Sequence, residues 1–147
     1  MHYPIALFGA WKAGLVVTNV NPLYTERELR LQLQDSGAQL LVVADMFLQS
    51  ALPVAQALGV RTMTASLWDF FEAPVADAIR SQMPLSDDST RPPDLLRMSD
   101  ALVRGAAMPK QHRRDHPVAL YQYTGGTTGR SKGAIITHQN ILGTIKI

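Results

Sequence analysis

Short apolar runs alternate with amphipathic stretches along the first half of the chain. Pro4 opens a segment from Ile5 to Trp11 that is apolar on nearly every side, which predicts a helix buried on more than one face. Gly14 is expected to end this helix. The β-branched run Leu15–Thr18 predicts a buried strand, and the aliphatic run Leu40–Ala44 predicts a further strand.

The helix between these two strands has clear boundary signals. Thr25 and Glu28 have the spacing of a capping box, so we expect a helix from about Glu26 to Ser36. Gly37 is expected to end it. The apolar residues on its inner side are Leu29 and Leu33.

The alternation of helix and strand continues in the next segment. Asp45 is expected to cap a helix that runs to about Leu58, with a kink or a restart at Pro53. Gly59 then leads into a weaker strand, Val60–Thr64. Strands that alternate with helices of about ten residues favour parallel pairing. The expected fold class is therefore α/β, with a parallel-rich sheet flanked by helices.

The second half of the chain contains a linker, two helices and a pair of strands. Met83–Pro93 is rich in proline and serine, which predicts an internal linker, and Asp94–Arg104 predicts a short helix beyond it. Val118–Tyr123 and Ala134–Thr137 have the composition of strands, and Asn140–Ile147 is typical of a helix.

Both terminal helices present apolar surface that no other predicted element covers. Nothing precedes Ile5–Trp11 to bury its outer side, and Asn140–Ile147 has neither a C-cap nor a closing glycine. We therefore expect residues 1–147 to form one incomplete domain that is truncated at both ends.

The composition narrows the classes of function. The chain has 147 residues and is 46% hydrophobic, which suffices for a globular core. Its net charge of +2 comes from interspersed acids and bases, so we expect no nucleic-acid partner. The chain has no cysteine for a disulfide or a thiolate metal site, and no apolar run reaches the about 20 residues that span a bilayer. We expect a soluble, cytoplasmic chain.

The connection between the last two strands carries the candidate chemistry. Three glycines within five positions allow positive φ and let backbone N–H groups converge on one point. Lys132 adds an ammonium group that can follow a phosphate as a mobile point charge. The donors expected to hold anionic oxygens are, in chain order, Thr124, Gly125, Gly126, Thr127, Thr128, Gly129 and Lys132. These groups suit a polyphosphate.

The spacing of this connection excludes two common nucleotide loops. A Walker A loop needs Gly-Lys-Ser/Thr before a helix, whereas Lys132 lies between Ser131 and Gly133 and a strand follows. A dinucleotide fingerprint needs Gly-x-Gly-x-x-Gly at the start of a helix, and these glycines do not have that order.

Two stretches resemble a known family. Tyr123–Ala134, continued by Ile135–Asn140, closely resembles the AMP-binding motif of the adenylate-forming superfamily of acyl-CoA synthetases. The doublet Gly125-Gly126 is similar to the bacterial long-chain fatty acyl-CoA ligase version, where many relatives have Ser-Gly. The stretches Ala6–Gly14, Asn19–Leu29 and Asp35–Gly37 are similar to that family's N-terminal subdomain, and only about residues 46–94 have no clear match.

The resemblance implies an acid–thiol ligase. Such an enzyme activates a fatty acid with ATP to give an acyl-adenylate, and the thiol of coenzyme A then displaces AMP. It also implies that Thr124–Gly129 and Lys132 hold the β- and γ-phosphates, with Mg²⁺ bridging them and no protein ligand assigned to the metal. Lys132 is the implied catalytic residue. Arg130-Ser131 departs from relatives, which often have a small or apolar residue and then Pro or Ala.

Several alternatives stay open. The loop can be a hairpin connection with an incidental lysine, and His138 is more typical of a helix cap or a solvent-facing group than of a catalytic base. Trp11 is more typical of a core or subunit contact than of a fatty-acid tunnel. The acid can be aryl or short-chain, and the chain can be a non-catalytic remnant of the fold.

Parts of the family's machinery have no counterpart in this sequence. No segment matches the family's adenine- and ribose-binding motifs or its C-terminal domain, so we expect this chain alone to be inactive. Whether the parent protein forms a homodimer or associates peripherally with the inner membrane stays open.

Overall fold

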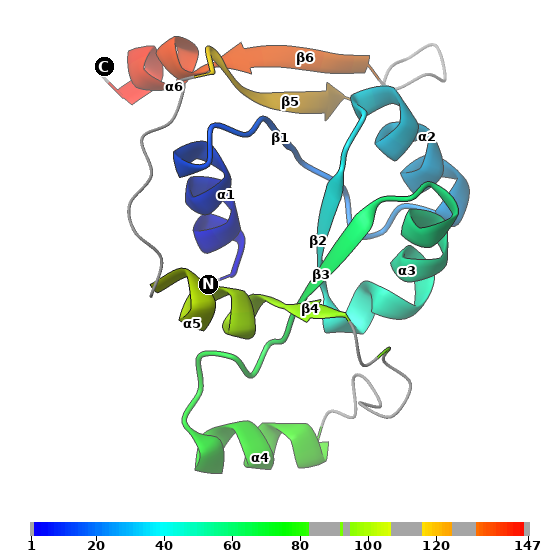
Figure 1. The fold of residues 1–147 in the computed structure, drawn as a ribbon, viewed down its shortest axis with the longest axis vertical. Helices are drawn as coiled ribbons and strands as arrows, with labels where there is room; N and C mark the ends of the chain where they lie inside the picture. Colours follow the sequence, from blue (N-terminus) through cyan, green and yellow to red (C-terminus); the bar gives the residue numbers. More distant parts are fainter. Residues whose placement is uncertain (1, 83–91, 93–94, 107–115, 125–131, 146–147) are drawn as a thin grey trace. The chain divides into compact units, whose positions relative to one another are not determined.

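The computed structural model of the chain describes residues 2–82, 92, 95–106, 116–124 and 132–145 (Figure 1). The chain divides into two compact units, one formed by Met1–Ala38 with Lys110–Ile147 and the other by Gln39–Pro109. In the described residues each unit has a three-stranded sheet of its own. The expected α/β class with parallel strands and flanking helices is confirmed, although the strands belong to two sheets.

The first unit joins segments from both ends of the chain. Its elements are α1 (His2–Lys12), β1 (Val17–Thr18), α2 (Glu26–Ser36), β5 (Val118–Thr124), β6 (Lys132–Thr137) and α6 (His138–Ile145). β5 is the central strand, since β1 pairs with it in parallel and β6 pairs with it antiparallel (Figure 1). This antiparallel hairpin is the exception to the parallel pairing expected from the sequence.

Helix α1 is less buried than its composition predicts. None of its described residues is buried, and Tyr3 and Phe8 are 57% and 58% exposed. The exposure of this helix agrees with the expectation that no other element of residues 1–147 covers its outer side. The helix end is as expected: Gly14 has a φ of 62°, and the Leu15 N–H donates to the Ala10 carbonyl at 2.9 Å.

Helix α2 has the predicted boundaries and the predicted cap. The Thr25 hydroxyl and N–H donate to Glu28 Oε2 at 2.7 and 2.8 Å, and the Glu28 N–H donates back to Thr25 Oγ1. The hydrogen bond from the Thr25 hydroxyl, followed by that from the Thr25 N–H, lowers the pKa of Glu28. Leu29 and Leu33 are buried as expected, and Gly37 ends the helix with a φ of 63°.

Helix α6 begins two residues earlier than predicted because it has a cap of the same kind. Asn140 Oδ1 accepts from the Thr137 N–H and hydroxyl at 2.9 and 2.7 Å, and the Asn140 N–H donates to Thr137 Oγ1 at 3.1 Å. Asn140 thus accepts hydrogen bonds from the capping threonine of α6, as Glu28 does from Thr25 at the start of α2. None of the described residues of α6 is buried.

The second unit is built on parallel strands. Its elements are β2 (Leu40–Ala44), the 3₁₀ turn η1 (Asp45–Phe47), α3 (Leu48–Ala57), β3 (Arg61–Ala65), α4 (Ala73–Gln82), β4 (Leu96–Arg97) and α5 (Met98–Ala106). β3 lies between β2 and β4 and is parallel to both. Val54 and Ala55 of α3 are fully buried and mark the core of this unit.

Three sequence expectations change in the second unit, and one helix was missed. Asp45 does not cap α3, because its carboxylate accepts from the adjacent Met46 N–H inside η1. Helix α3 continues through Pro53, so it does not restart there, and it ends close to the expected Leu58. α5 begins at Met98 rather than Asp94, since Leu96–Arg97 pair with β3. α4 was not predicted. Of the expected linker 83–93, the structure describes only Pro92.

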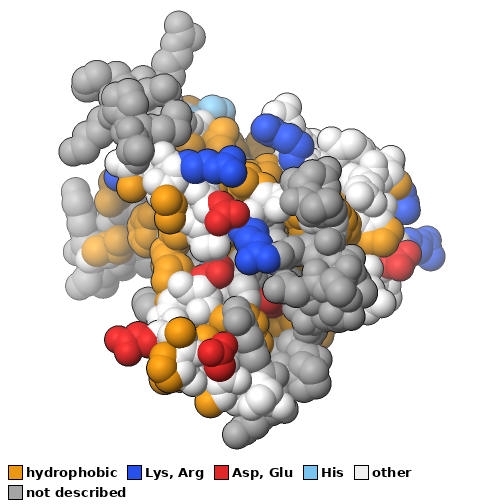
Figure 2. Space-filling model, turned by 60° about the horizontal axis from the view of Figure 1, so that its bottom comes forward, with side chains coloured by type: hydrophobic (Ala, Val, Ile, Leu, Met, Phe, Trp, Pro, Cys, Tyr) orange, Lys and Arg blue, Asp and Glu red, His pale blue; other side chains and the backbone are white. Residues whose placement is uncertain are grey.

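The described surface carries charges of both signs. Figure 2 shows basic and acidic side chains scattered among apolar ones on the face that it draws. Among the described helices, none combines the length and the apolar character needed to cross a bilayer.

Candidate phosphate-binding site

The candidate site lies at the end of the β5–β6 hairpin where the connection 125–131 joins the two strands. Thr124 is the last residue of β5, Lys132 is the first residue of β6, and the two are paired directly across the strands. Residues that face each other in an antiparallel pair extend their side chains from the same side of the sheet. The Thr124 and Lys132 side chains are both exposed, so a hydroxyl and an ammonium group border the same side of this end of the hairpin.

Most of the predicted donors lie outside the described residues. Gly125, Gly126, Thr127, Thr128 and Gly129 belong to the connection 125–131, which the structure does not describe. Their predicted role therefore stays a prediction. The described residues do confirm that this connection joins two strands rather than a strand and a helix, as the spacing argument requires.

Central strand β5 is attached to the N-terminal elements of its unit. The Trp11 indole N–H donates to the Ala119 carbonyl at 2.9 Å, and Asn19 Nδ2 donates to Gln122 Oε1 at 3.3 Å. The buried Gln32 on α2 donates to the Asn19 carbonyl at 2.7 Å. Helix α1 thus contacts β5 directly through Trp11, and helix α2 contacts it through Asn19.

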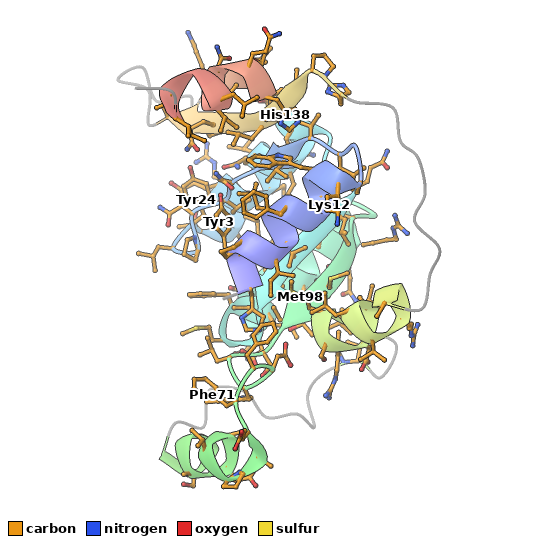
Figure 3. All side chains as sticks on the ribbon, turned by 90° about the vertical axis from the view of Figure 1, so that its left-hand side faces the viewer. Tyr3, Lys12, Tyr24, Phe71, Met98 and His138 are labelled. Carbon is orange, nitrogen blue, oxygen red and sulfur yellow. The ribbon has the colours of Figure 1, made fainter. Side chains whose placement is uncertain are left out.

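His138 has a packing role. Its ring meets the ring of Trp11 edge to face, with centroids 5.3 Å apart and an interplanar angle of 77°. Figure 3 shows His138 at the beginning of α6, where Thr137 rather than His138 provides the cap. His138 therefore does not provide the cap, and its half-buried ring makes an aromatic contact. Trp11 contacts Ala119 and His138, which agrees with the core contact that the sequence analysis favoured over a fatty-acid tunnel.

Tyr123 forms the tightest polar contact next to the site. Its hydroxyl donates to Asp35 Oδ2, in the last turn of α2, at 2.5 Å. Removal of water from around the phenol raises the pKa of Tyr123 to about 12, and the hydrogen bond to Asp35 and the charge of Asp35 act in the same direction. The hydroxyl therefore keeps its proton at neutral pH and acts as a donor.

Gly133 lies opposite Tyr123 in the hairpin. A Cβ atom placed on Gly133 would come within 3.1 Å of Cε2 and Cζ of the Tyr123 ring. The ring therefore occupies the space that a side chain at position 133 would need. A side chain at position 133 would therefore require the Tyr123 ring to shift by a few tenths of an ångström, whereas glycine lets the ring stay in place.

The roles of Asp35 and Tyr123 were missed in the sequence. Both residues lie in stretches that carry the family resemblance, but nothing in either stretch indicates that they meet. They are 88 positions apart, and a contact over that distance depends on the pairing of β1 with β5.

Comparison with known proteins supports the family that the sequence of the β5–β6 hairpin resembles. Residues 1–147 match a protein family that is described as "AMP-binding enzyme". The chain belongs to the AMP-binding enzyme family.

Named proteins of this family are similar to the chain over almost its whole length. A long-chain-fatty-acid–CoA ligase from Escherichia coli O6:H1 is 36% identical over 99% of this chain and 27% of its own length. One from Haemophilus influenzae is 38% identical over 97% of this chain and 26% of its own length. The chain thus spans about a quarter of the length of the curated relatives that it matches.

Solved structures share the fold. A long-chain-fatty-acid-CoA ligase from Archaeoglobus fulgidus superposes with a TM-score of 0.60 and 26% identity, over 97% of this chain and 24% of that chain. A red-emitting luciferase from Phrixothrix hirtus has a TM-score of 0.66 at 21% identity, over 95% of this chain and 24% of that chain. The luciferase likeness extends to the fold alone.

Proposed function

We propose that this AMP-binding chain is the phosphate-holding part of an ATP-dependent long-chain fatty acid–CoA ligase. The observation that carries the proposal is the pairing of Thr124 with Lys132 at the two ends of a glycine- and threonine-rich connection. The similarity to several bacterial long-chain-fatty-acid–CoA ligases supports the choice of substrate class.

The proposed reaction has two steps. A carboxylate oxygen of the acid attacks the α-phosphorus of ATP, and the bond from that phosphorus to the bridging oxygen of pyrophosphate breaks. The thiol of coenzyme A then attacks the acyl carbon, loses its proton and displaces AMP. In the first step Lys132 and the Thr124 hydroxyl offset the charge that develops on the departing pyrophosphate, because fixed donors and cations stabilise such charge best.

Magnesium belongs to the proposal as a partner of the phosphates. A hydroxyl and an ammonium group suit phosphate oxygens, whereas Mg²⁺ takes its ligands mainly from phosphates, water and carboxylates. The donors at this site therefore fit the nucleotide, and a bound Mg²⁺ would neutralise part of the phosphate charge. No residue of this chain is assigned as a magnesium ligand.

A lysine substitution tests the proposed function. In the product of the complete reading frame that encodes this chain, Lys132→Ala should slow acyl-adenylate formation by about 100-fold, the usual effect of removing one such donor. Thioester formation from supplied acyl-adenylate should stay nearly unchanged. ATP–pyrophosphate exchange measures the first step, and thioester release measures the second.

The same assays separate the alternatives. Equal loss in both steps would contradict the role given to Lys132. Exchange with aryl or short-chain acids but not with long-chain acids would replace the proposed substrate. A reading frame that stops at Ile147 and a product without exchange would favour the non-catalytic remnant.

We further propose that the ligase is a cytoplasmic protein that meets its fatty acid at the inner membrane as a peripheral protein. The chemical reason is that a long-chain acid partitions into lipid. Flotation of the full product with anionic vesicles tests this association, and sedimentation tests whether the parent is a homodimer.

A further inference from the structure

Helix α2 holds the end of β5 at two neighbouring places. Gln32 and Asp35 are three residues apart on α2 and therefore lie on the same side of the helix. Gln32 reaches β5 through Asn19, whose amide donates to Gln122, and Asp35 accepts directly from Tyr123. Two adjacent residues of β5 are thus fixed by one face of one helix.

The direct contact is sterically confined. Gly133 of β6 leaves room for the Tyr123 ring, and a Cβ atom there would come within 3.1 Å of it. The hydroxyl of the same ring is 2.5 Å from Asp35 Oδ2. The ring is therefore confined by β6 at its edge and by α2 at its hydroxyl.

This arrangement adjoins both ends of the candidate phosphate loop. Tyr123 immediately precedes Thr124, and Gly133 immediately follows Lys132. A shift of the paired strand ends at Tyr123 and Gly133 would therefore also displace the adjacent pair Thr124 and Lys132, which the proposed function assigns to phosphate. Displacement of a reacting group by about 1 Å can cost on the order of 100-fold in rate.

We propose that Asp35, Tyr123 and Gly133 form a clamp that positions Thr124 and Lys132 for phosphate during adenylation. The clamp consists of positioning residues, because none of the three is assigned a contact with the nucleotide. The proposal rests on the proposed function, since it concerns the same site. No proton is transferred through the clamp, because the phenol donates a hydrogen bond and stays neutral.

Two variants remove the clamp from opposite sides. Tyr123→Phe keeps the ring against Gly133 and removes only the hydroxyl, and Asp35→Ala removes only the acceptor. Each should slow ATP–pyrophosphate exchange by on the order of tenfold, mainly in kcat, because the groups that act in the transition state lose their alignment. The double variant should be no slower than either single variant, since both remove the same contact.

Conservative and matched variants separate positioning from general stability. Asp35→Asn keeps an oxygen that can accept from Tyr123, so it should recover most of the exchange rate that Asp35→Ala loses. Tyr121→Phe removes a hydroxyl from the same strand but keeps the hydrogen bond between Tyr123 and Asp35, so it should leave exchange unchanged. Thioester formation from supplied acyl-adenylate should be unchanged in all variants.

Hydrogen exchange gives a readout that does not depend on catalysis. Amide exchange at Thr124 and Lys132 should be faster in Tyr123→Phe than in the parent protein or in Tyr121→Phe. Unchanged amide exchange together with unchanged adenylation in Tyr123→Phe would overturn the clamp. Equal losses in Tyr121→Phe and Tyr123→Phe would also overturn it, because they would indicate a general effect of strand β5.

Lys132→Ala, measured in the same assays, tells the two proposals apart. Slow exchange in Lys132→Ala with normal exchange in Tyr123→Phe overturns the clamp and leaves the ligase proposal intact. Normal exchange in Lys132→Ala overturns the assignment of the phosphate site, and the clamp with it.

Discussion

At the scale of single residues, Tyr123 couples the stability of the first unit to pH. Its pKa rises from the ordinary 10.0 to about 12, because the folded protein removes water from the ring and because Asp35 accepts a hydrogen bond and carries a negative charge. Tyr121 acts in the same direction. A folded-state pKa above the unfolded one means that folding favours the neutral phenol, so its contribution is complete below pH 10.0 and is lost as the pH rises through about 12.

The corresponding prediction concerns alkaline unfolding. The free energy of unfolding should fall between pH 10.0 and about 12, and part of this fall should be absent in Tyr123→Phe. Urea unfolding at a series of pH values measures it. The difference between the two proteins is the informative quantity, because it isolates the contribution of the Tyr123 hydroxyl. Parallel pH profiles for the two proteins would mean that the phenol of Tyr123 titrates alike in the folded and unfolded chain.

Gly133 provides a second prediction at this scale. Gly133→Ala should lower the free energy of unfolding by about 1–2 kcal/mol, because the new methyl group crowds a ring that Asp35 holds in place. Gly143→Ala is the matched control: a Cβ there has nothing within 4 Å, and alanine should stabilise helix α6 by about 0.5–1 kcal/mol. Thermal or urea unfolding distinguishes the expected loss of stability in Gly133→Ala from the expected gain in Gly143→Ala.

A double substitution checks the cause. In a Tyr123→Ala background the cost of Gly133→Ala should disappear, because the ring that it meets is gone. A cost that persists in that background would assign the effect to the backbone of β6 instead of to the ring.

At the scale of elements, two helices with the same kind of cap should respond differently to its loss. Thr25→Ala should cost about 1 kcal/mol in global stability, because α2 contributes the buried Leu29 and Leu33. Thr137→Ala should mainly loosen α6, none of whose described residues is buried. Urea unfolding reports the global loss, and amide exchange in α6 reports local opening. A global cost as large for Thr137→Ala would show that α6 unfolds together with the rest of its unit.

Elements with local signals could be predicted, and those defined by distant partners could not. α2 and β2 have the predicted boundaries, because a capping box, a closing glycine and an aliphatic run all lie within the segments themselves. β4 has only two residues and exists through its pairing with β3, so no periodicity marks it. The division into two sheets depends on β1 meeting β5, about which local patterns say nothing.

The site follows the same division. The strand–loop–strand arrangement and the position of Lys132 at the end of the loop could be predicted from composition and spacing. The contact of Tyr123 with Asp35 could not, because it requires α2 and β5 to be adjacent in space. The fixing of the loop ends is therefore a property of the first unit as a whole, whereas the choice of donors is a property of the loop sequence.

At the scale of the whole chain, the first unit exposes an apolar strand edge. β6 is at the edge of its sheet, and Ile135 in its middle is 64% exposed. Further exposed apolar residues of the same unit are Tyr3, Phe8, Leu15, Leu142 and Ile145. An edge strand with unpaired backbone groups and apolar side chains favours association with another chain.

This surface predicts self-association of the isolated 147-residue chain. Ile135→Lys should reduce it, because a lysine on an edge strand must be desolvated before a second strand can pair there. Val103→Lys is the matched control. Val103 is 75% exposed, but it lies on helix α5 of the other unit, and a helix offers no unpaired strand backbone for pairing. Sedimentation velocity at increasing concentration should show larger species for the chain and for Val103→Lys than for Ile135→Lys. A monodisperse parent chain that unfolds cooperatively would contradict the argument, because the exposed edge of β6 would then be tolerated without a partner.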